Sequence, residues 1–424
     1  MSTSKSSSSL LKSIPSITHL SQRSILEISG PDSPKFLKGL SCKDVDVLGG
    51  GYSGFLNASG RILHTSFIFP TTRKTTTKNG VVKEEKSYLI SHESPEGHPA
   101  PLQDVLPPFK LRAKVRIKDV SDQWDLYSAY ASTSGKGKGK RPMRNWKFGS
   151  GGAAESQWSW ENGEVADLGL GEGEIGCWDL RGGWGEEGMG RQVLVPRGDK
   201  PSLTSSHDLT STEQYHLRRM ILGIPEGPNE IIPGQALPLE SCMDLHGGVD
   251  FRKGCYLGQE LTVRTYHTGA TRKRILPIRL LPLNQTQSIG EYLSSPSPSP
   301  AQIPNDLSGE GLEITYTPSS SSASKKSRSA GKILSLHSST NTNVGDIGLG
   351  LGLVRIEFAE RSCWSDNFQD QVQKQGIKDW YENGENHRLT TQIGDRAYGV
   401  YVDKGEAYSE ALRVLAEKEQ SGKV

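Results

Sequence analysis

The sequence predicts an α+β protein that ends in a small antiparallel barrel or sandwich. Strand-like and helix-like segments interleave through the first 275 residues without a repeated strand–helix–strand rhythm, which argues against a parallel α/β sheet. After residue 274, short apolar runs separated by turns follow one another, as is typical of antiparallel strands. A chain of 424 residues is long enough for two or three compact units.

The N-terminal half opens with clear strand and helix signals. Residues 19–30 hold an apolar run that ends at a Gly-Pro break, which predicts a strand. Asp32 or Ser33 can cap a following helix that has Pro34 at its first position. Residues 51–70 predict two strands joined by a turn.

Three later segments complete the predicted elements of the body and the chain end. Residues 86–91 predict a further short strand. Thr210 and Glu213 stand at the spacing of a capping box, and Gly223 closes the same helical pattern, so this is the clearest helix in the sequence. Residues 409–420 predict a closing helix.

Polar, low-complexity segments interrupt these elements. They cannot bury enough apolar surface to become ordered, so we expect extended surface loops at 71–87, 132–140, 294–300 and 318–331. Residues 146–164 resemble another loop, although their tryptophans predict that part of it docks. The expected regions are a segment 1–20, a body 21–275 with insertions near 71–87 and 132–163, a barrel-like unit 276–403 with insertions near 294–306 and 318–331, and a helix or tail 404–424.

Composition narrows the classes of function. The 50 Lys and Arg and 48 Asp and Glu leave a formal net charge of +2. The net charge of the whole chain is therefore too small to attract nucleic acid or an acidic membrane, and any basic patch must be local. No run approaches the ~20 apolar residues of a membrane-spanning helix. The five cysteines contain no CxxC, which argues against a disulfide framework or a preformed zinc site and favours a reducing compartment.

The first residues are rich in serine and carry Lys5, Lys12 and Arg23, with no acidic residue before Glu27. This composition suits an organelle transit segment. A disordered Ser-rich tail is the alternative.

Residues 249–274 concentrate the reactive chemistry of the chain. A short helix is predicted with Gly258 near its N-cap, so Cys255 precedes a helix N-terminus, where N–H groups and the flanking Arg252 and Lys253 favour the thiolate. A thiolate in this place can attack an electrophile, ligate a soft metal or be oxidised. The alternative is a small buried cysteine in a Gly-rich turn.

Basic side chains continue this run. Arg264, Arg272, Lys273 and Arg274 can line a site for a carboxylate or phosphate, with Tyr256 as the face for a flat ring. A solvated charged face is the alternative. The interleaving of glycines, aromatics and cations favours a site.

Two segments of this run, "KGCYLGQELTVR" and "HTGATRKRILP", resemble the K-G-C-Y-x-G-Q-E signature of the YgfZ-type proteins. These are folate-binding relatives of the glycine-cleavage T protein, and the resemblance is greatest to their mitochondrial iron–sulfur cluster assembly branch. The likeness extends upstream to "LGIPEGPNEIIPGQALPLE" and "GVDFRKGCY". Weaker likenesses at "FLKGLSCKDV", "FLNASGRIL" and "CWDLRGGWGEEGMGRQVLVP" extend it over most of residues 20–280, and in the last of these a D-x-R…G-x-R pattern matches Asp179, Arg181, Gly190 and Arg191.

The resemblance implies a T-protein-type fold, with an α+β body of two intertwined subdomains around a central opening and a C-terminal β-barrel. It also implies a mitochondrial matrix protein that helps to mature [4Fe–4S] clusters, with A-type iron–sulfur scaffold proteins and [4Fe–4S] client enzymes as partners and tetrahydrofolate as the bound small molecule. By position, Cys255 is the catalytic thiol and a candidate transient cluster ligand. The implied cofactor-binding residues are Lys253, Gly254, Tyr256, Gly258, Gln259, Glu260, Arg264 and Lys273.

Four departures from the T protein bear on this function. Residues 60–65 contain no carboxylate where the T protein has acidic residues, and Ile221 stands where it has a glutamate that can hold the pterin. Residues 41–44 alter the family's Thr-Asn-Asp, and Cys242 replaces an asparagine. The lost hydrogen-bond acceptors argue against aminomethyl transfer and weaken pterin binding. Cys242 and Cys255 together are too few soft ligands for a closed metal site.

Three functions therefore remain open. The first is an assembly factor in which the Cys255 thiolate transiently ligates cluster iron or takes part in a partner's thiol chemistry. The second is a folate-dependent one-carbon transferase in which Cys255 or Glu260 assists transfer. The third is an interaction scaffold that has lost ligand binding.

Overall fold

The computed structural model describes residues 14–46, 49–76, 80, 82–93, 100–130, 141–185, 188–284, 286–294, 311–318, 326–337, 348–366, 368, 374–382 and 387–422. The chain forms two compact units. The larger unit draws on Lys12–Arg218, Glu226–Ala270 and Ala407–Val424, and the smaller on Arg219–Pro225 and Thr271–Glu406. Within the described ranges, no helix is both long enough and apolar enough to cross a membrane.

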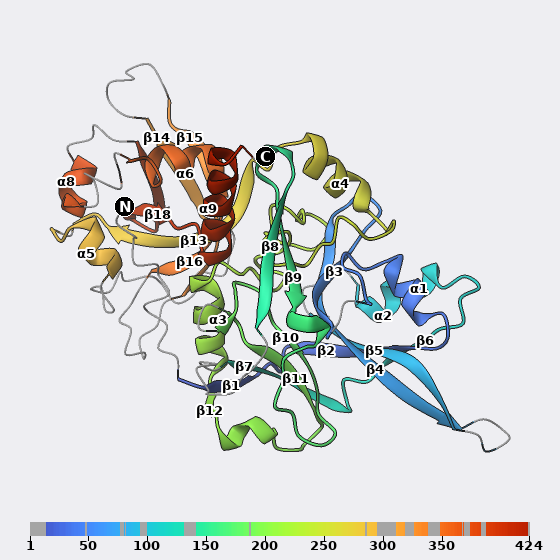
Figure 1. Cartoon of the computed structure of the whole chain (residues 1–424). Coiled ribbons are helices and arrows are strands. Elements are labelled where there is room, and N and C mark those ends of the chain that lie inside the picture. The colour runs from blue at the N-terminus through green and yellow to red at the C-terminus, as the bar shows by residue number, and fades with distance from the viewer. Residues whose placement is uncertain are drawn as a thin grey trace. The chain divides into compact units, whose positions relative to one another are not determined.

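The larger unit contains a five-stranded antiparallel sheet that carries two short helices (Figure 1). In spatial order, its strands are β3 (Gly51–Leu56), β4 (Ile62–Thr76), β5 (Val82–Glu93), β2 (Arg23–Ser29) and β6 (Arg116–Asp119). The helices are α1 (Ser33–Lys38) and α2 (Leu102–Val105). Both pack apolar side chains onto one core, whose members include Leu26, Leu37, Ile90, Leu102 and Val115. The predicted first strand, first helix and two joined strands are confirmed.

Two predictions in this sheet are wrong in detail. Asp32 precedes α1 but makes no side-chain cap, because its carboxylate accepts a hydrogen bond from the Lys114 N–H at 2.7 Å. The expected loop at 71–87 is largely strand, since β4 runs to Thr76 and β5 begins at Val82. Its threonines suit a strand, and opposite charges face each other across the ribbon, as Arg73 does Glu85.

A second five-stranded sheet lies in the same unit. Its spatial order is β10 (Ile175–Trp178), β11 (Arg191–Pro196), β7 (Trp124–Tyr130), β1 (Ser16–His19) and β12 (Asp208–Thr210). Its neighbouring strands are antiparallel except for the parallel pair β1 and β12. The core on this sheet contains Ile17, Ala129, Val193, Val195 and Leu203.

The segment 146–164, expected to be a loop with docked tryptophans, contributes to a hairpin. β8 (Pro142–Phe148) pairs with β9 (Ala154–Trp160), and Trp146 is buried. The predicted loop at 132–140 lies outside the described residues.

Two longer helices follow in the chain. α3 (Thr212–Ile221) begins two residues after the predicted cap, because Thr210 belongs to β12 and its hydroxyl bonds that of Thr18 at 2.7 Å. α4 (Gln259–Thr268) confirms the helix predicted after Gly258. Short 3-10 turns lie at Pro107–Phe109, Ser150–Gly152, Glu161–Gly163 and Ser202–Ser205.

The smaller unit is a closed antiparallel barrel, which confirms the barrel alternative of the prediction. In order its strands are β13 (Lys273–Pro282), β16 (Leu349–Arg355), β15 (Arg328–His337), β14 (Glu313–Thr317), β17 (Arg388–Ile393) and β18 (Arg396–Val402). β13 pairs with both β16 and β18 and so closes the ring. The helices in this stretch are α5 (Ile289–Ser294), α6 (Ile356–Ser362) and α8 (Ile377–Glu382).

Of the loop predicted at 294–300, residues 295–300 lie outside the described residues, as do residues 319–325 of the loop predicted at 318–331. The second prediction is wrong at its end, because residues 328–331 belong to β15 and pair with β14. The predicted closing helix is confirmed as α9 (Glu406–Gln420). From Ala407 onward it belongs to the larger unit, where Glu410 pairs with Arg144 and the Lys418 ammonium donates to the Trp146 carbonyl at 3.3 Å.

Candidate functional site

Cys255 lies in the loop that leads into α4 and is exposed, whereas the other four cysteines are buried. Burial raises the pKa of the Cys42 and Cys363 thiols to about 12, and that of Cys177 well above its usual value. Buried thiols with such pKa values are poor nucleophiles and ligands. Cys255 is therefore the accessible thiol among the five cysteines.

The loop around Cys255 is fastened to the end of α1. The Lys253 ammonium donates to the carbonyl oxygens of Lys38, at 2.8 Å, and of Ser41. The Leu257 N–H donates to the Gly39 carbonyl at 2.9 Å. Because Lys253 and Leu257 are both held, Cys255 is presented between two fixed points.

The two cations expected to favour the thiolate have other partners. Burial lowers the pKa of Lys253 to about 8, and its ammonium lies 4.6 Å from the centre of the Tyr256 ring. The Arg252 guanidinium pairs with the Asp250 carboxylate, with Nε and Oδ1 3.4 Å apart. Lys253 thus acts as a cap on the carbonyl groups at the end of α1, a role that its place in the motif does not reveal.

The remaining motif residues divide between the loop and α4. Gly254 is exposed, Tyr256 is buried, and the Gln259 side chain accepts a hydrogen bond from the Tyr256 N–H at 3.2 Å. Gly258 has φ +76°, and an added Cβ there would clash with the Asn57 carbonyl oxygen, so glycine is required.

Glu260 and Arg264 are exposed on α4. Lys273 begins β13 in the smaller unit. The structure thus brings Lys253 and Tyr256 together, presents Cys255, Glu260 and Arg264 to solvent, and assigns Lys273 to a different unit.

A solvent-open pocket lies in the larger unit. Three tryptophans line it, together with acidic, basic and small residues, namely Lys43, Gly49, Gly50, Glu155, Ser156, Gln157, Trp158, Trp160, Trp178, Leu180, Gly247, Val249, Asp250 and Arg252.

Burial shifts the pKa values of two ionisable groups in this pocket. Burial raises the pKa of the Glu155 carboxyl, and the nearby Asp250 adds to the effect. Burial also lowers the pKa of Lys43. Among the residues that the structure describes, the buried Ser156 hydroxyl and Trp158 indole N–H have no hydrogen-bond partner. Unsatisfied buried donors of this kind are rare in proteins and indicate a place for a ligand or for water.

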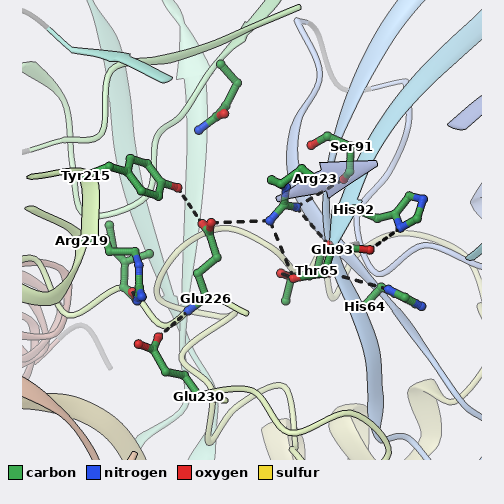
Figure 2. Close-up of polar contacts among 12 residues, drawn as sticks. Arg23, His64, Thr65, Ser91, His92, Glu93, Tyr215, Arg219, Glu226 and Glu230 are labelled. Atoms are coloured by element: carbon green, nitrogen blue, oxygen red, sulfur yellow. Dashed lines mark hydrogen bonds and ion pairs between the residues drawn. The ribbon is translucent and has the colours of Figure 1, made fainter. Parts of the chain in front are cut away.

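A buried ionic network connects the two sheets of the larger unit (Figure 2). Arg23 on β2 lies 3.9 Å from the Glu93 carboxylate and 3.5 Å from that of Glu226. Glu226 also accepts from the Arg181 guanidinium, at 2.7 Å, and from the Tyr215 hydroxyl, at 2.8 Å. Each carboxylate thus meets a guanidinium in a region that excludes water.

Arg181 continues the network toward the second sheet. Its guanidinium pairs with Asp179 at 2.7 Å, next to the end of β10, and stacks over the Phe67 ring at 4.7 Å. Asp179 and Arg181 belong to the D-x-R pattern of the sequence, so that pattern encodes a buried ion pair.

Glu93 supplies a carboxylate that sequence reasoning missed. Residues 60–65 contain none, yet the Glu93 carboxylate accepts from the Thr65 hydroxyl and lies 3.8 Å from the His64 ring nitrogen. Burial opposes its charge, but Arg23, His64 and Thr65 together outweigh burial and lower the pKa of Glu93. Glu93 directly faces Arg23 across β5 and β2, a pairing that only the strand register reveals.

Comparison with known proteins first defines the class. No family model matches the chain. Its fold is that of the aminomethyltransferase T of the glycine cleavage system from Bartonella henselae, with a TM-score of 0.52 and 10% identity over 95% of this chain and 88% of that one. This confirms a T-protein-type α+β fold with a C-terminal antiparallel barrel.

Sequence relatives define the family within that class. The chain is 59% identical over 404 residues to "Iron-sulfur cluster assembly factor IBA57 homolog, mitochondrial" of Cryptococcus neoformans var. neoformans serotype D, covering 95% of this chain and 98% of the relative. A protein of the same name from Neurospora crassa is 36% identical over 265 residues, 62% of this chain and 53% of that one. The chain belongs to this family of mitochondrial iron–sulfur cluster assembly factor homologues.

Because Cys255 is the accessible thiol, we expect one thiol per native chain to react rapidly with a thiol reagent. All five should react once the chain is unfolded in denaturant. The Cys255→Ser variant should lose the rapid reaction. A second rapidly reacting thiol in the native protein would contradict this arrangement.

His92 should make stability depend on pH. Burial and the nearby His64 lower its pKa to about 4, against 6.5 in the unfolded chain. The folded state therefore binds fewer protons between these values, and the free energy of unfolding falls as pH drops through that window. We expect His92 to account for a loss of about 2 kcal/mol between pH 7 and pH 5.

Urea unfolding at both pH values measures this loss. The His92→Gln variant should show a smaller pH dependence, whereas His267→Gln, which changes an exposed residue on α4, should match the wild type. An unaltered pH dependence in His92→Gln would show that other groups cause the loss.

Proposed function

We propose that this chain is an assembly factor of the mitochondrial matrix that supports the maturation of [4Fe–4S] proteins, with Cys255 as its reactive thiol. The observation that carries the proposal is the exposure of Cys255, alone among five cysteines, in a loop held at Lys253 and Leu257. The names of its relatives support the assembly role and the mitochondrial location. The basic, Ser-rich first residues suit import.

The cluster is cargo in this proposal, and a partner completes its coordination. Thiolates are the usual ligands of iron–sulfur clusters, and four ligands are needed. Among the residues that the structure describes, no group of three or more His, Cys, Asp or Glu side chains is arranged to hold a metal. Cys255 therefore contributes one ligand, and the thiolates of an A-type scaffold protein or a [4Fe–4S] client enzyme contribute the others.

Tetrahydrofolate is the small molecule that we assign to the tryptophan-lined pocket, and the chemistry of the lining residues supports this. Carboxylates at Glu155 and Asp250 can accept hydrogen bonds from the amino and ring N–H groups of a pterin. The Ser156 hydroxyl and the Trp158 N–H, which have no hydrogen-bond partner among the described residues, can bind polar atoms of the pterin. The indole rings can cover the pterin ring. Lys43 and Arg252 suit the carboxylates of the glutamate tail.

One-carbon transfer, the enzymatic alternative, is less well supported. It requires a carboxylate that can accept a proton, and Glu93 is the carboxylate beside His64 and Thr65. Its pKa is lowered by Arg23 and by its hydrogen-bonded neighbours, so it is a weak base. We therefore favour the assembly role.

The Cys255→Ser variant tests the assembly role. We expect anaerobic iron–sulfur reconstitution of the purified protein with an A-type scaffold partner to give a cluster with the wild type and about tenfold less with the variant, because one thiolate ligand is lost. Absorbance and Mössbauer spectra measure cluster content. His267→Gln, an exposed change on α4, should behave as the wild type.

Activities of [4Fe–4S] enzymes in cells that carry each variant extend this test. Full cluster formation and full enzyme activity with Cys255→Ser would remove the thiol from the mechanism.

The Glu155→Gln variant tests whether tetrahydrofolate binds in the tryptophan-lined pocket. We expect tetrahydrofolate to quench the tryptophan fluorescence of the wild type and to bind Glu155→Gln about tenfold more weakly, because a charged acceptor becomes neutral. Cys255→Ser should bind tetrahydrofolate like the wild type. Equal affinities of the wild type and Glu155→Gln would place the ligand elsewhere.

A further inference from the structure

Residues 107–118, "PPFKLRAKVRIK", run from just after α2 into β6, to which residues 116–118 belong, and are called here the 107–118 segment. They contain five basic residues and no acidic one. The whole chain has a formal net charge of only +2, so this segment is a local concentration of positive charge.

Two large apolar side chains of this segment lie in water. Leu111 is 90% exposed and Phe109 is 40% exposed. Leu111 also has a φ of +45°, a left-handed conformation that a leucine rarely adopts. Both the exposure and the backbone strain cost free energy in the isolated protein, and strain of this kind is concentrated at functional places.

The base of the segment is rigid. Leu102, Leu106 and Val115 are buried in the core of the first sheet. The Phe109 N–H bonds the Leu106 carbonyl at 3.1 Å, and the Lys110 N–H bonds the Pro107 carbonyl at 3.0 Å. The position of Leu111 in solvent is therefore imposed by a fixed support.

The cations of the segment surround these apolar side chains in sequence, and all five are exposed, namely Lys110, Arg112, Lys114, Arg116 and Lys118. Arg116 pairs with Glu85 at 3.3 Å. Within the described part of the chain, the other four form no ion pair. Their charge is thus available to an anionic surface.

We propose that the 107–118 segment docks this protein on an anionic lipid surface, with Phe109 and Leu111 inserted at the interface and the cations on lipid phosphates. Apolar side chains flanked by Lys and Arg are the combination that binds such interfaces. A stable protein partner needs about 20–30 residues on each side, more than twelve residues supply. Leu111 also stands clear of neighbouring side chains, as insertion requires.

Co-sedimentation of the full chain with vesicles tests the proposal. We expect binding to phosphatidylcholine mixed with phosphatidylglycerol, little binding to phosphatidylcholine alone, and a marked loss of binding at high salt. Leu111→Ser should weaken binding to the mixed vesicles about tenfold, and the double variant Lys110→Glu, Arg112→Glu should abolish it. Leu111 is exposed, so its replacement should leave folding intact.

Leu209→Ser is the matched control, because Leu209 is 70% exposed on β12, in the other sheet. It should bind the mixed vesicles like the wild type. The proposal is overturned by absence of binding to mixed vesicles, by equal binding to neutral ones, or by equal losses in Leu111→Ser and Leu209→Ser. It is also overturned if Leu111→Ser impairs only the capture of an acidic protein partner, since that result would assign the segment to protein recognition.

Discussion

The larger unit depends on a set of charges that are out of reach of water. Two guanidinium groups, of Arg23 and Arg181, and three carboxylates, of Asp179, Glu93 and Glu226, pair with one another between the two five-stranded sheets. Burying a single one of these charges without its partner would cost several kcal/mol. The strands that supply them must therefore keep their register, and the sheets must keep their separation.

The ionic network and the tryptophan-lined pocket can be compared as places for a ligand. Its carboxylates accept hydrogen bonds from the Arg181 guanidinium and from the Tyr215 and Thr65 hydroxyl groups, and the Glu93 Oε2 atom has no hydrogen-bond partner among the described residues. In the tryptophan-lined pocket, the Ser156 hydroxyl and the Trp158 N–H likewise have no hydrogen-bond partner within the described ranges. The two places differ in access, because the pocket is open to solvent and the charges of the network are buried.

Much of the fold follows from local sequence rules. The apolar run before Gly30, the proline that opens α1 and the closing helix were all readable, because each depends on residues close together in the chain. The ribbon of β4 and β5 was not, since its polar residues form strands only when they face each other. The start of α3 was misplaced because Thr210 is used by a strand pair that is 192 residues distant in sequence.

Some residues of the candidate site could also be predicted from local sequence, and others could not. The motif around Cys255 and the family were identified from contiguous residues. Glu93 and the capping role of Lys253 depend on contacts across strands and between distant segments, and no local pattern reports them. The pocket combines side chains from four separate stretches of the chain, so its existence could not be inferred from any one of them.

The double anchorage of the Cys255 loop on α1 has a consequence for the speed and cost of complex formation. A flexible loop loses conformational entropy when a partner immobilises it, and that loss weakens binding. Here Lys253 and Leu257 are immobilised before any encounter, by bonds to the Lys38 and Gly39 carbonyls. A partner that binds this loop therefore meets a pre-ordered backbone, so association loses little conformational entropy there.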